Sequence, residues 1–370
     1  MDIDNLFESV PNFSEGQDHE VIGTIAGAAS HAHLLDVDAD PDHHRVVISL
    51  AAFRGRLIAA LMAAVQVAIE RIDVGLHVGV HPRVGAADVV PIVPLGETSL
   101  ASCREVAREL GERIWTELKV PVYFYGEHQT LADVRAGRAH LDLGGPSLHP
   151  TAGAVCVGAR RKLVAFNVLL PGMDARAARS LARSLRESQA GRRGVQALVF
   201  ELPGGRVQLS MNLFRLEETS AGAVVAELER RGVVVGWQQV VGLCPAAVAN
   251  PAAAGRLLEA RLAASAARAG SLRCNERGGD EHVALAARLQ REAESFGLLG
   301  IDQLDLLAGA ERAAALVPVL GAAGVLDGEL EAMLRVAARG LREAISPETA
   351  ALKAVRTAAL DRRLESGRGD

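Results

Sequence analysis

Residues 34–70 read LLDVDADPDHHRVVISLAAFRGRLIAALMAAVQVAIE and decide the fold class of the chain. Segments 34–38 and 45–51 are rich in Leu, Val and Ile, which predicts two β-strands joined by a turn over Asp40–His44. Downstream, apolar residues recur at helical spacing from Leu57 to Ile69, so an amphipathic helix follows the strands. The stretch therefore predicts a layered unit of strands and helices.

The same alternation continues on both sides of this stretch, and strands alternating with helices indicate layered packing of the α/β or α+β type. Further strands are expected at 89–93, 120–125, 154–157, 163–170, 195–202, 207–213 and 233–235. Helices are expected at 18–29, 103–118, 173–191 and 221–231. Beyond Pro251 the chain is rich in Ala, Leu, Arg and Glu and should be mostly helical, with a polar break at 275–281. The last predicted helix carries one apolar face, formed by Leu330, Met333, Leu334, Ala337, Leu341 and Ile345.

Length and composition predict a globular protein of two or three compact units. The chain has 370 residues, of which 49% are hydrophobic and 23% charged. Its 40 Lys and Arg against 45 Asp and Glu give a net charge of −5, and only 3% of residues are aromatic. Both facts argue against a nucleic-acid partner, because the chain offers neither a general excess of positive charge nor many stacking platforms.

No targeting segment or membrane span is predicted. The first ten residues lack a basic segment followed by an apolar one, so we expect a cytoplasmic protein. The longest apolar run, residues 313–326, contains one proline and two glycines and is shorter than the ~20 residues a bilayer requires. The four cysteines form no CxxC pair, so neither a zinc site nor a redox motif is expected.

The segment HVGVHPRVGAADVVP, residues 77–91, is the most informative for chemistry. His77 and His81 stand four apart, a spacing that suits metal binding on a helix, but Gly79 and Pro82 disfavour that helix. A loop histidine with a pKa near ~6.5 can instead shuttle protons, although it can equally be structural. Arg83 is a candidate partner for a ligand carboxylate, with an internal salt bridge to an aspartate as the alternative.

Two further segments have both structural and functional interpretations. PNFSEG, residues 11–16, either begins the first helix or places Asn12 in a ligand-binding loop. The segment GAVCVGARR, residues 153–161, lacks the GxGxxG spacing and is followed by a predicted strand, so it is not a dinucleotide-binding motif. The sequence also lacks the phosphate-binding motif GxxxxGK[ST] and the GxSxG motif of acyl-transfer enzymes.

Seven motifs in collinear order resemble the glutamate formimidoyltransferases, over roughly the first two thirds of the chain. They are VPNFSEG at 10–16, LLDVDADP at 34–41, HVGVHPRVGAADVVP at 77–91, PVYFYGE at 121–127, VGARRKLVAFN at 157–167, QLSMNLF at 208–214 and VVGLCP at 240–245. The resemblance implies an α+β protein with two ferredoxin-like subdomains flanking a folate tunnel. On this basis we expect subdomains at 1–173 and 174–325 and a helical C-terminal extension at 326–370.

The resemblance also implies a reaction and a set of site residues. The formimidoyl group of N-formimidoyl-L-glutamate would pass to N5 of tetrahydrofolate, a co-substrate, as a step of histidine degradation, with His81 as acid/base and no metal. The expected folate-contacting residues are Gly145, Pro146, Ser147, Leu148, His149, Pro150, Thr151, Ala152 and Gly153. Asp38 is expected to orient His81 or bind the pterin, Arg83 or Arg160 to hold carboxylates, and Asn12 to contact the substrate.

The remaining expectations concern partners and alternatives. The resemblance implies a homodimer that binds small molecules and no membrane. The chain departs from the family's pattern at Asp40, His44 and Val80, which keeps open a different formimidoyl or formyl amine as donor. A catalytically silent folate-binding protein is the third interpretation. The cyclodeaminase domain of the animal enzymes is not expected after residue 326.

Overall fold

The computed structural model describes residues 5–297, 300–347 and 349. The chain divides into two compact units, one formed by the residues up to 244 with 327–332, and the other by 245–326 with the residues from 333 onward. The first unit holds the strands and six of the α-helices, so its mixed α+β class is the class that the sequence predicts.

The larger sheet of the first unit has seven strands within the described residues, in the spatial order β3, β4, β1 with β2, β5, β7, β6. Its strands are β1 (Leu6–Ser9), β2 (Asn12–Phe13), β3 (His33–Asp40), β4 (Arg45–Phe53), β5 (Ala87–Pro94), β6 (Val122–Tyr125) and β7 (Val155–Ala159). Pairings are antiparallel except those that β7 makes with β5 and β6. The predicted turn after Asp40 joins β3 to β4, which confirms the hairpin.

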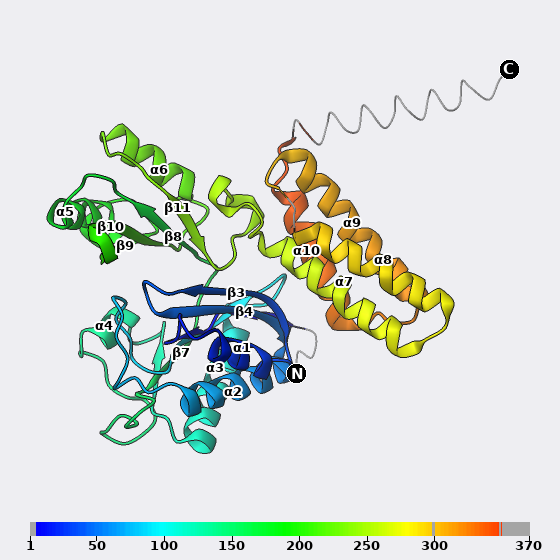
Figure 1. Ribbon diagram of the computed structural model, residues 1–370, viewed down its shortest axis with the longest axis horizontal. Helices are drawn as coiled ribbons and strands as arrows, with labels where there is room; N and C mark the ends of the chain where they lie inside the picture. The colour runs from blue at the N-terminus through cyan, green and yellow to red at the C-terminus, as the bar shows by residue number, and fades with distance from the viewer. Residues whose placement is uncertain (1–4, 298–299, 348, 350–370) are drawn as a thin grey trace. The chain divides into compact units, whose positions relative to one another are not determined.

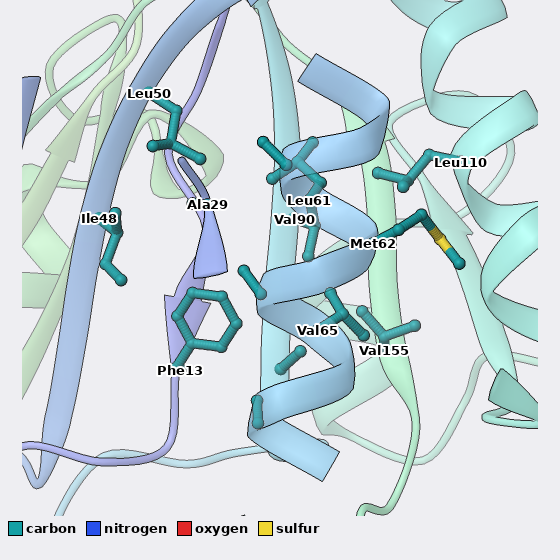
Figure 2. Close-up of a cluster of buried hydrophobic side chains, with 14 of the residues drawn as sticks. Phe13, Ala29, Ile48, Leu50, Leu61, Met62, Val65, Val90, Leu110 and Val155 are labelled. Atoms are coloured by element: carbon teal, nitrogen blue, oxygen red, sulfur yellow. The ribbon is translucent and has the colours of Figure 1, made fainter. Parts of the chain in front are cut away.

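Helices α1 (His19–Ala28), α2 (Arg54–Arg71) and α3 (Leu100–Arg113) bury their apolar faces against this sheet (Figure 1). Figure 2 shows α2 lying along the sheet, with Leu61 and Val65 beside Val90 of β5. The side chain of Asp18 accepts hydrogen bonds from two backbone amides of the first turn, so Asp18 caps α1. Helix α2 spans the predicted range from Leu57 to Ile69 and buries small and branched residues against the strands, so this prediction is confirmed.

The smaller sheet has the order β11, β8, β10, β9 and is antiparallel. Its strands are β8 (Val164–Leu169), β9 (Val195–Leu202), β10 (Arg206–Leu213) and β11 (Gln238–Val241). Helix α5 (Ala175–Leu185) packs on β9 and β10, and α6 (Ala221–Arg230) follows β10 in sequence. A short helix, α4 (Leu131–Arg135), lies between β6 and β7 in the chain and belongs to the connections of the larger sheet.

Two predictions in this region were wrong. The helix predicted to run to residue 191 ends at Leu185, because Arg186 is extended and its Nε donates to the carbonyl of Ala197 on β9. The strand predicted at 233–235 is not formed, and Val234 is exposed. The chain begins to pair with β8 only after residue 235, where Leu169 exchanges backbone hydrogen bonds with Gly236 and Trp237. The edge strand is therefore β11.

The second unit is helical, as the composition beyond Pro251 predicts. It contains α7 (Leu258–Arg277), α8 (Asp280–Gly297), α9 (Gln303–Ala322) and the greater part of α10 (Gly328–Glu343). The predicted polar break is the pair Gly278 and Gly279, both at positive φ, between α7 and α8. The apolar face expected on α10 is confirmed from Leu330 to Leu341, which are buried, but Ile345 lies beyond the end of the helix and is half-buried. No helix in the described part of the chain combines the length and apolar character that a bilayer span requires.

Glu329, in the first turn of α10, is a buried carboxylate within the first unit. It accepts hydrogen bonds from the backbone amide of Phe53 at 2.6 Å and from Arg56 at 2.5 Å, and it pairs with His33 at 3.0 Å. Burial acts to raise the pKa of Glu329, but the hydrogen bonds from His33 and Phe53 prevail and lower it. The ionised carboxylate is therefore the form that this cluster stabilises.

Replacing Glu329 by Ala leaves a buried amide and a buried histidine without their partner. We expect Glu329→Ala to lower the free energy of unfolding by about 3 kcal/mol, measured by urea denaturation at neutral pH. Glu112→Ala, at an exposed position of α3, is the matched control and should stay within about 0.5 kcal/mol of wild type. Equal effects of the two substitutions would contradict the stabilising role of Glu329.

Candidate functional site

The segment between α2 and β5 is a loop that carries His81. His77 and His81 are therefore not on a helix, as Gly79 and Pro82 predict. The carboxylate of Asp88 on β5 accepts a hydrogen bond from the backbone amide of Val84 at 2.5 Å and so fixes the end of the loop. Burial raises the pKa of Asp88, which Arg135 at 3.5 Å and the Val84 amide partly offset.

The ring of His81 lies against Arg45, the first residue of β4. Nη1 of Arg45 is 2.8 Å from Nε2 of His81. A guanidinium only donates hydrogen bonds, so Nε2 accepts, and the ring is a neutral imidazole with its proton on Nδ1. Phe200 of β9 stacks on His81 with ring centroids 5.7 Å apart, and His43 lies 6.0 Å away.

Electrostatics around His81 strongly favour the neutral ring. The pKa of His81 is lowered to about 2, chiefly because the ring is buried and then because Arg45, Arg135 and His43 lie nearby. The carbonyl of Pro82 acts in the opposite direction but is a smaller influence. In this structure His81 is a neutral imidazole whose Nε2 lone pair already accepts a hydrogen bond from the Arg45 guanidinium.

Arg45 and Arg83 are cations at this site that make no ion pair with any carboxylate of the described residues. Burial lowers the pKa of Arg45, and Arg135 acts in the same direction, while Asp88, Asp40 and Asp38 act in the opposite direction. Burial also lowers the pKa of Arg83, whose Nη2 donates to the carbonyl of His81 at 3.1 Å.

The internal salt bridge considered for Arg83 is not formed in the described structure. Asp88 pairs with Arg135 instead, and Asp73 accepts a hydrogen bond from the Gly75 amide at 2.8 Å. Arg45 and Arg83 are half-buried, and a guanidinium that is partly removed from water gains from an anion that completes its hydrogen bonding. The two arginines therefore suit an anionic ligand.

These side chains surround one pocket on the first unit. It is lined by Ser14, His43, His44, Arg45, His81, Arg83 and Asp88. Two of its buried polar atoms, Nδ1 of His43 and Nη1 of Arg83, have no hydrogen-bond partner within the described structure, while Nδ1 of His44 lies 3.6 Å from Oε1 of Glu15. Buried polar groups are nearly always satisfied in folded proteins, so their concentration here indicates a place where a ligand completes the hydrogen bonding.

Groups from both sheets meet at this pocket. Nε2 of His43, in the turn between β3 and β4, is 2.9 Å from the side-chain oxygen of Gln208 on β10. The ring of His43 also contacts Phe200 of β9 edge-on, with centroids 4.7 Å apart. The carboxylate of Asp38 on β3 accepts a hydrogen bond from the Gly242 amide at 2.8 Å. Polar contacts thus join the two sheets at Asp38 and at His43, the second of which lies beside His81.

The loop expected to contact folate, residues 145–153, is joined to the histidine loop through its end. Gly153 bridges to Gly85, and the Ala86 amide donates to the carbonyl of Ala152 at 2.9 Å. Nδ1 of His149 accepts a hydrogen bond from the Ala152 amide at 3.0 Å, which closes the loop on itself. The structure therefore brings together two segments that the sequence separates.

Asn12 and Arg160 are not among the residues that line this pocket. Asn12 is on β2 between β4 and β5, and its side-chain amide donates to the carbonyl of Val10 at 3.0 Å. The backbone amide of Arg160 donates to the carbonyl of Ile92. Arg160 thus lies at the opposite end of β5 from Gly85, about 20 Å along the strand at ~3.3 Å per residue. Of the two arginines expected to hold carboxylates, the structure places Arg83 beside His81.

Sequence reasoning missed Arg45, His43 and Phe200. Arg45 begins a strand that is otherwise almost fully buried, and a cation at the start of such a strand is unusual enough to mark a functional position. Its neighbour His43 is 3% exposed, which a turn rich in polar residues does not suggest. Phe200 lies in the other sheet, and no local pattern connects it with His81.

A family model for the formiminotransferase domain, N-terminal subdomain, matches residues 6–160, the range that forms the larger sheet. Glutamate formimidoyltransferase of Thermoplasma acidophilum is 35% identical to this chain over 268 residues, which are 65% of this chain and 88% of that protein. The chain belongs to the formimidoyltransferase family.

Other members are similarly related. The glutamate formimidoyltransferase of Streptococcus pyogenes is 36% identical and covered over 89% of its length. The formimidoyltransferase-cyclodeaminase of Rattus norvegicus is 37% identical, and the chain matches 50% of its length. The expected family is therefore confirmed, and the chain is a member of a family of transferases.

The close approach of the two loops requires glycine at residue 85. A Cβ there would lie 2.0 Å from the carbonyl oxygen of Ala154 and 2.6 Å from that of Ala152. We expect Gly85→Ala to lower the free energy of unfolding by about 2 to 3 kcal/mol, measured by urea denaturation. Gly145→Ala is the matched control, because a Cβ at residue 145 meets no atom within 4 Å and its φ is not positive. A neutral Gly85→Ala variant would show that the loops are not held this closely.

The lowered pKa of His81 makes stability depend on pH. The unfolded chain binds a proton on this ring below pH ~6.5 and the folded chain does not, so the stability from neutral His81 is present above that pH and is lost as the pH falls toward 2. Between pH ~7 and ~5 wild type should lose about 2 kcal/mol more than His81→Gln, measured by urea denaturation at both pH values.

His19→Gln removes an exposed histidine and serves as the control, since it leaves His81 in place. This control should show the pH dependence of wild type. Equal losses in wild type and in His81→Gln would mean that the His81 ring is protonated as readily in the folded chain as in the unfolded one.

Proposed function

We propose that this protein is a glutamate formimidoyltransferase that moves the formimidoyl group from N-formimidoyl-L-glutamate to N5 of tetrahydrofolate, as a step of histidine degradation. The observation that carries the proposal is a neutral His81 held beside Arg45 and Arg83 in a pocket with unsatisfied polar atoms. Membership of the formimidoyltransferase family supports it.

In this proposal His81 acts as base and then as acid. N5 attacks the amidine carbon of the donor, and a tetrahedral adduct forms that carries an extra proton on the attacking nitrogen. The imidazole takes that proton and returns it to the nitrogen of glutamate, which then leaves as a neutral amine when its bond to carbon breaks. A histidine that is neutral before the reaction is able to accept the proton in the first of these steps.

The charges of both substrates fit the cations of the pocket. N-formimidoyl-glutamate carries two carboxylates, and the glutamate tail of folate carries at least as many. Arg83 has an Nη1 without a partner in the described chain and is the residue we propose for a donor carboxylate. Three further residues are proposed to contact parts of the substrates that lie farther from Arg83, namely Arg160, Asp38 and Asn12.

The folate is proposed to bind between two ferredoxin-like subdomains, residues 1–173 and 174–325, in contact with the loop 145–153. The polar contacts between the two sheets next to His81, and the joining of this loop to the histidine loop, support that location. A homodimer in the cytoplasm and a helical extension over 326–370 complete the proposal, the residues after 349 lying outside those described.

The test is the absorbance change on forming 5-formimidoyltetrahydrofolate, with the methenyl form read after acidification. We expect turnover by wild type, and a loss of about 10² to 10⁴ in kcat for His81→Ala with folate affinity kept. His19→Gln is the control and should turn over as wild type does.

The outcome also separates the other candidates. Folate binding without turnover of this donor would overturn N-formimidoyl-glutamate and direct the search to other formimidoyl or formyl amines, a possibility that the departures at Asp40, His44 and Val80 favour. Folate binding without turnover of any such amine would identify a silent folate-binding protein.

A further inference from the structure

The contact between Arg45 and His81 presents a conflict for proton transfer. The lone pair of Nε2 is the basic site of a neutral imidazole whose proton is on Nδ1, and Nη1 of Arg45 already donates to it at 2.8 Å. While this hydrogen bond lasts, Nε2 accepts no proton from a substrate. Something must therefore move Arg45 before His81 can work as a base.

Arg45 is held in a way that permits such a change. It forms no ion pair with a carboxylate in the described part of the chain, and its pocket neighbour Arg83 is also without one. Asp38, Asp40 and Asp88 act on Arg45 only from a distance. A buried guanidinium gains more from a carboxylate than from a neutral imidazole, because an ionised acceptor makes the stronger hydrogen bond.

We propose that Arg45 is a positioning residue that blocks the Nε2 of His81 in the free protein and releases it when a substrate carboxylate takes over the guanidinium. This inference rests on the proposed function for the identity of the carboxylate, and it adds the order of events. Binding of the anionic substrate comes first, and the base becomes available only then. A pocket without substrate thereby keeps its histidine unreactive.

The groups that face Arg45 and His81 determine how the His81 ring should titrate. Those facing His81 are Arg45 from β4, Arg135 from α4, His43 from the turn before β4 and Phe200 from β9. Those acting on Arg45 are Asp88 from β5, Asp38 and Asp40 from β3, and Arg135. Burial and these cations keep the His81 pKa low, and neutralising Arg45 removes the largest of the charge effects.

The direct test is an NMR titration of the full-length protein with isotope-labelled histidine rings, with His81 assigned from the spectrum of His81→Gln. In free wild type the His81 ring should stay neutral down to about pH 5. Saturation with N-acetyl-L-glutamate, an unreactive dicarboxylate, should raise its pKa by at least about one unit, a tenfold change in proton affinity. The diamide of this probe has no charge and should leave the ring unchanged.

Variants give an independent reading. Arg45→Met should raise the His81 pKa in the free protein by at least about one unit, and Arg45→Lys should raise it less because a cation remains. Arg104→Met, at an exposed position of α3, is the matched control and should leave the ring as in wild type. The titration of wild type with and without the probe needs no variant, so it stands if Arg45→Met does not fold.

A wild-type ring that titrates near pH ~6.5 without ligand would overturn the proposal, as would a ring that N-acetyl-L-glutamate leaves unchanged. Kinetics give a second test, because kcat reports the substrate complex and kcat/KM the free protein. The acid limb of the kcat profile should lie at higher pH than the acid limb of the kcat/KM profile. Arg45→Met should reduce the difference in pH between the two limbs. If the proposed function alone is wrong, N-acetyl-L-glutamate still raises the His81 pKa but the protein does not turn over N-formimidoyl-glutamate. If only the release by Arg45 is wrong, the protein turns over this donor but the probe leaves the His81 pKa unchanged.

Discussion

The close approach of two backbones at Gly85 and Gly153 is the constraint on which the rest of the site depends. Each glycine lies where a Cβ would overlap a carbonyl oxygen of the other loop, at 2.0 Å for Gly85 and 2.3 Å for Gly153. This antiparallel contact lies just before β5 and β7, which pair in parallel, so both loops are held where they enter the sheet. His81 is four residues away and inherits its position from the sheet. Loops that are fixed in this way can carry chemistry that demands a defined geometry.

On that scaffold the chain gathers positive charge and leaves it uncompensated. Arg45 and Arg135 act on the neutral imidazole of His81, and Arg83 donates to the His81 backbone carbonyl. In the described chain, only Arg135 of these three pairs with a carboxylate. A protein of net charge −5 attracts an anionic ligand only through such a local arrangement. Arg45, which suits a carboxylate, also lowers the pKa of His81. In the proposed reaction, attraction of the substrate and activation of the base are therefore opposed in the free protein, and a substrate carboxylate that neutralises Arg45 reconciles them.

Much of the fold could be predicted because its determinants are local. The strands around 34–51, the helix from Leu57 and the apolar face of α10 follow from the spacing of buried residues. Errors arose where a tertiary contact overrode a local tendency. The Ala-rich helix stops at Leu185 because Arg186 bonds to a strand, and the strand near residue 235 moved to β11 because β8 offers its hydrogen bonds there. His81 and Arg83 were recognised from the motif HPR, whereas Arg45 and Phe200 were not.

The sequence by itself determined the family and the mixed α+β class, because motifs and periodicity lie in short segments, and it supplied His81 as the proposed proton-transfer residue. Only the tertiary structure decided which groups surround that histidine. The turn before β4, the loop before β5 and the strands of the smaller sheet are far apart in the chain, and the burial and charge that set the His81 pKa arise from all three together. Electrostatic interaction depends on distance in space and on exclusion of water, and neither quantity exists before the chain is folded.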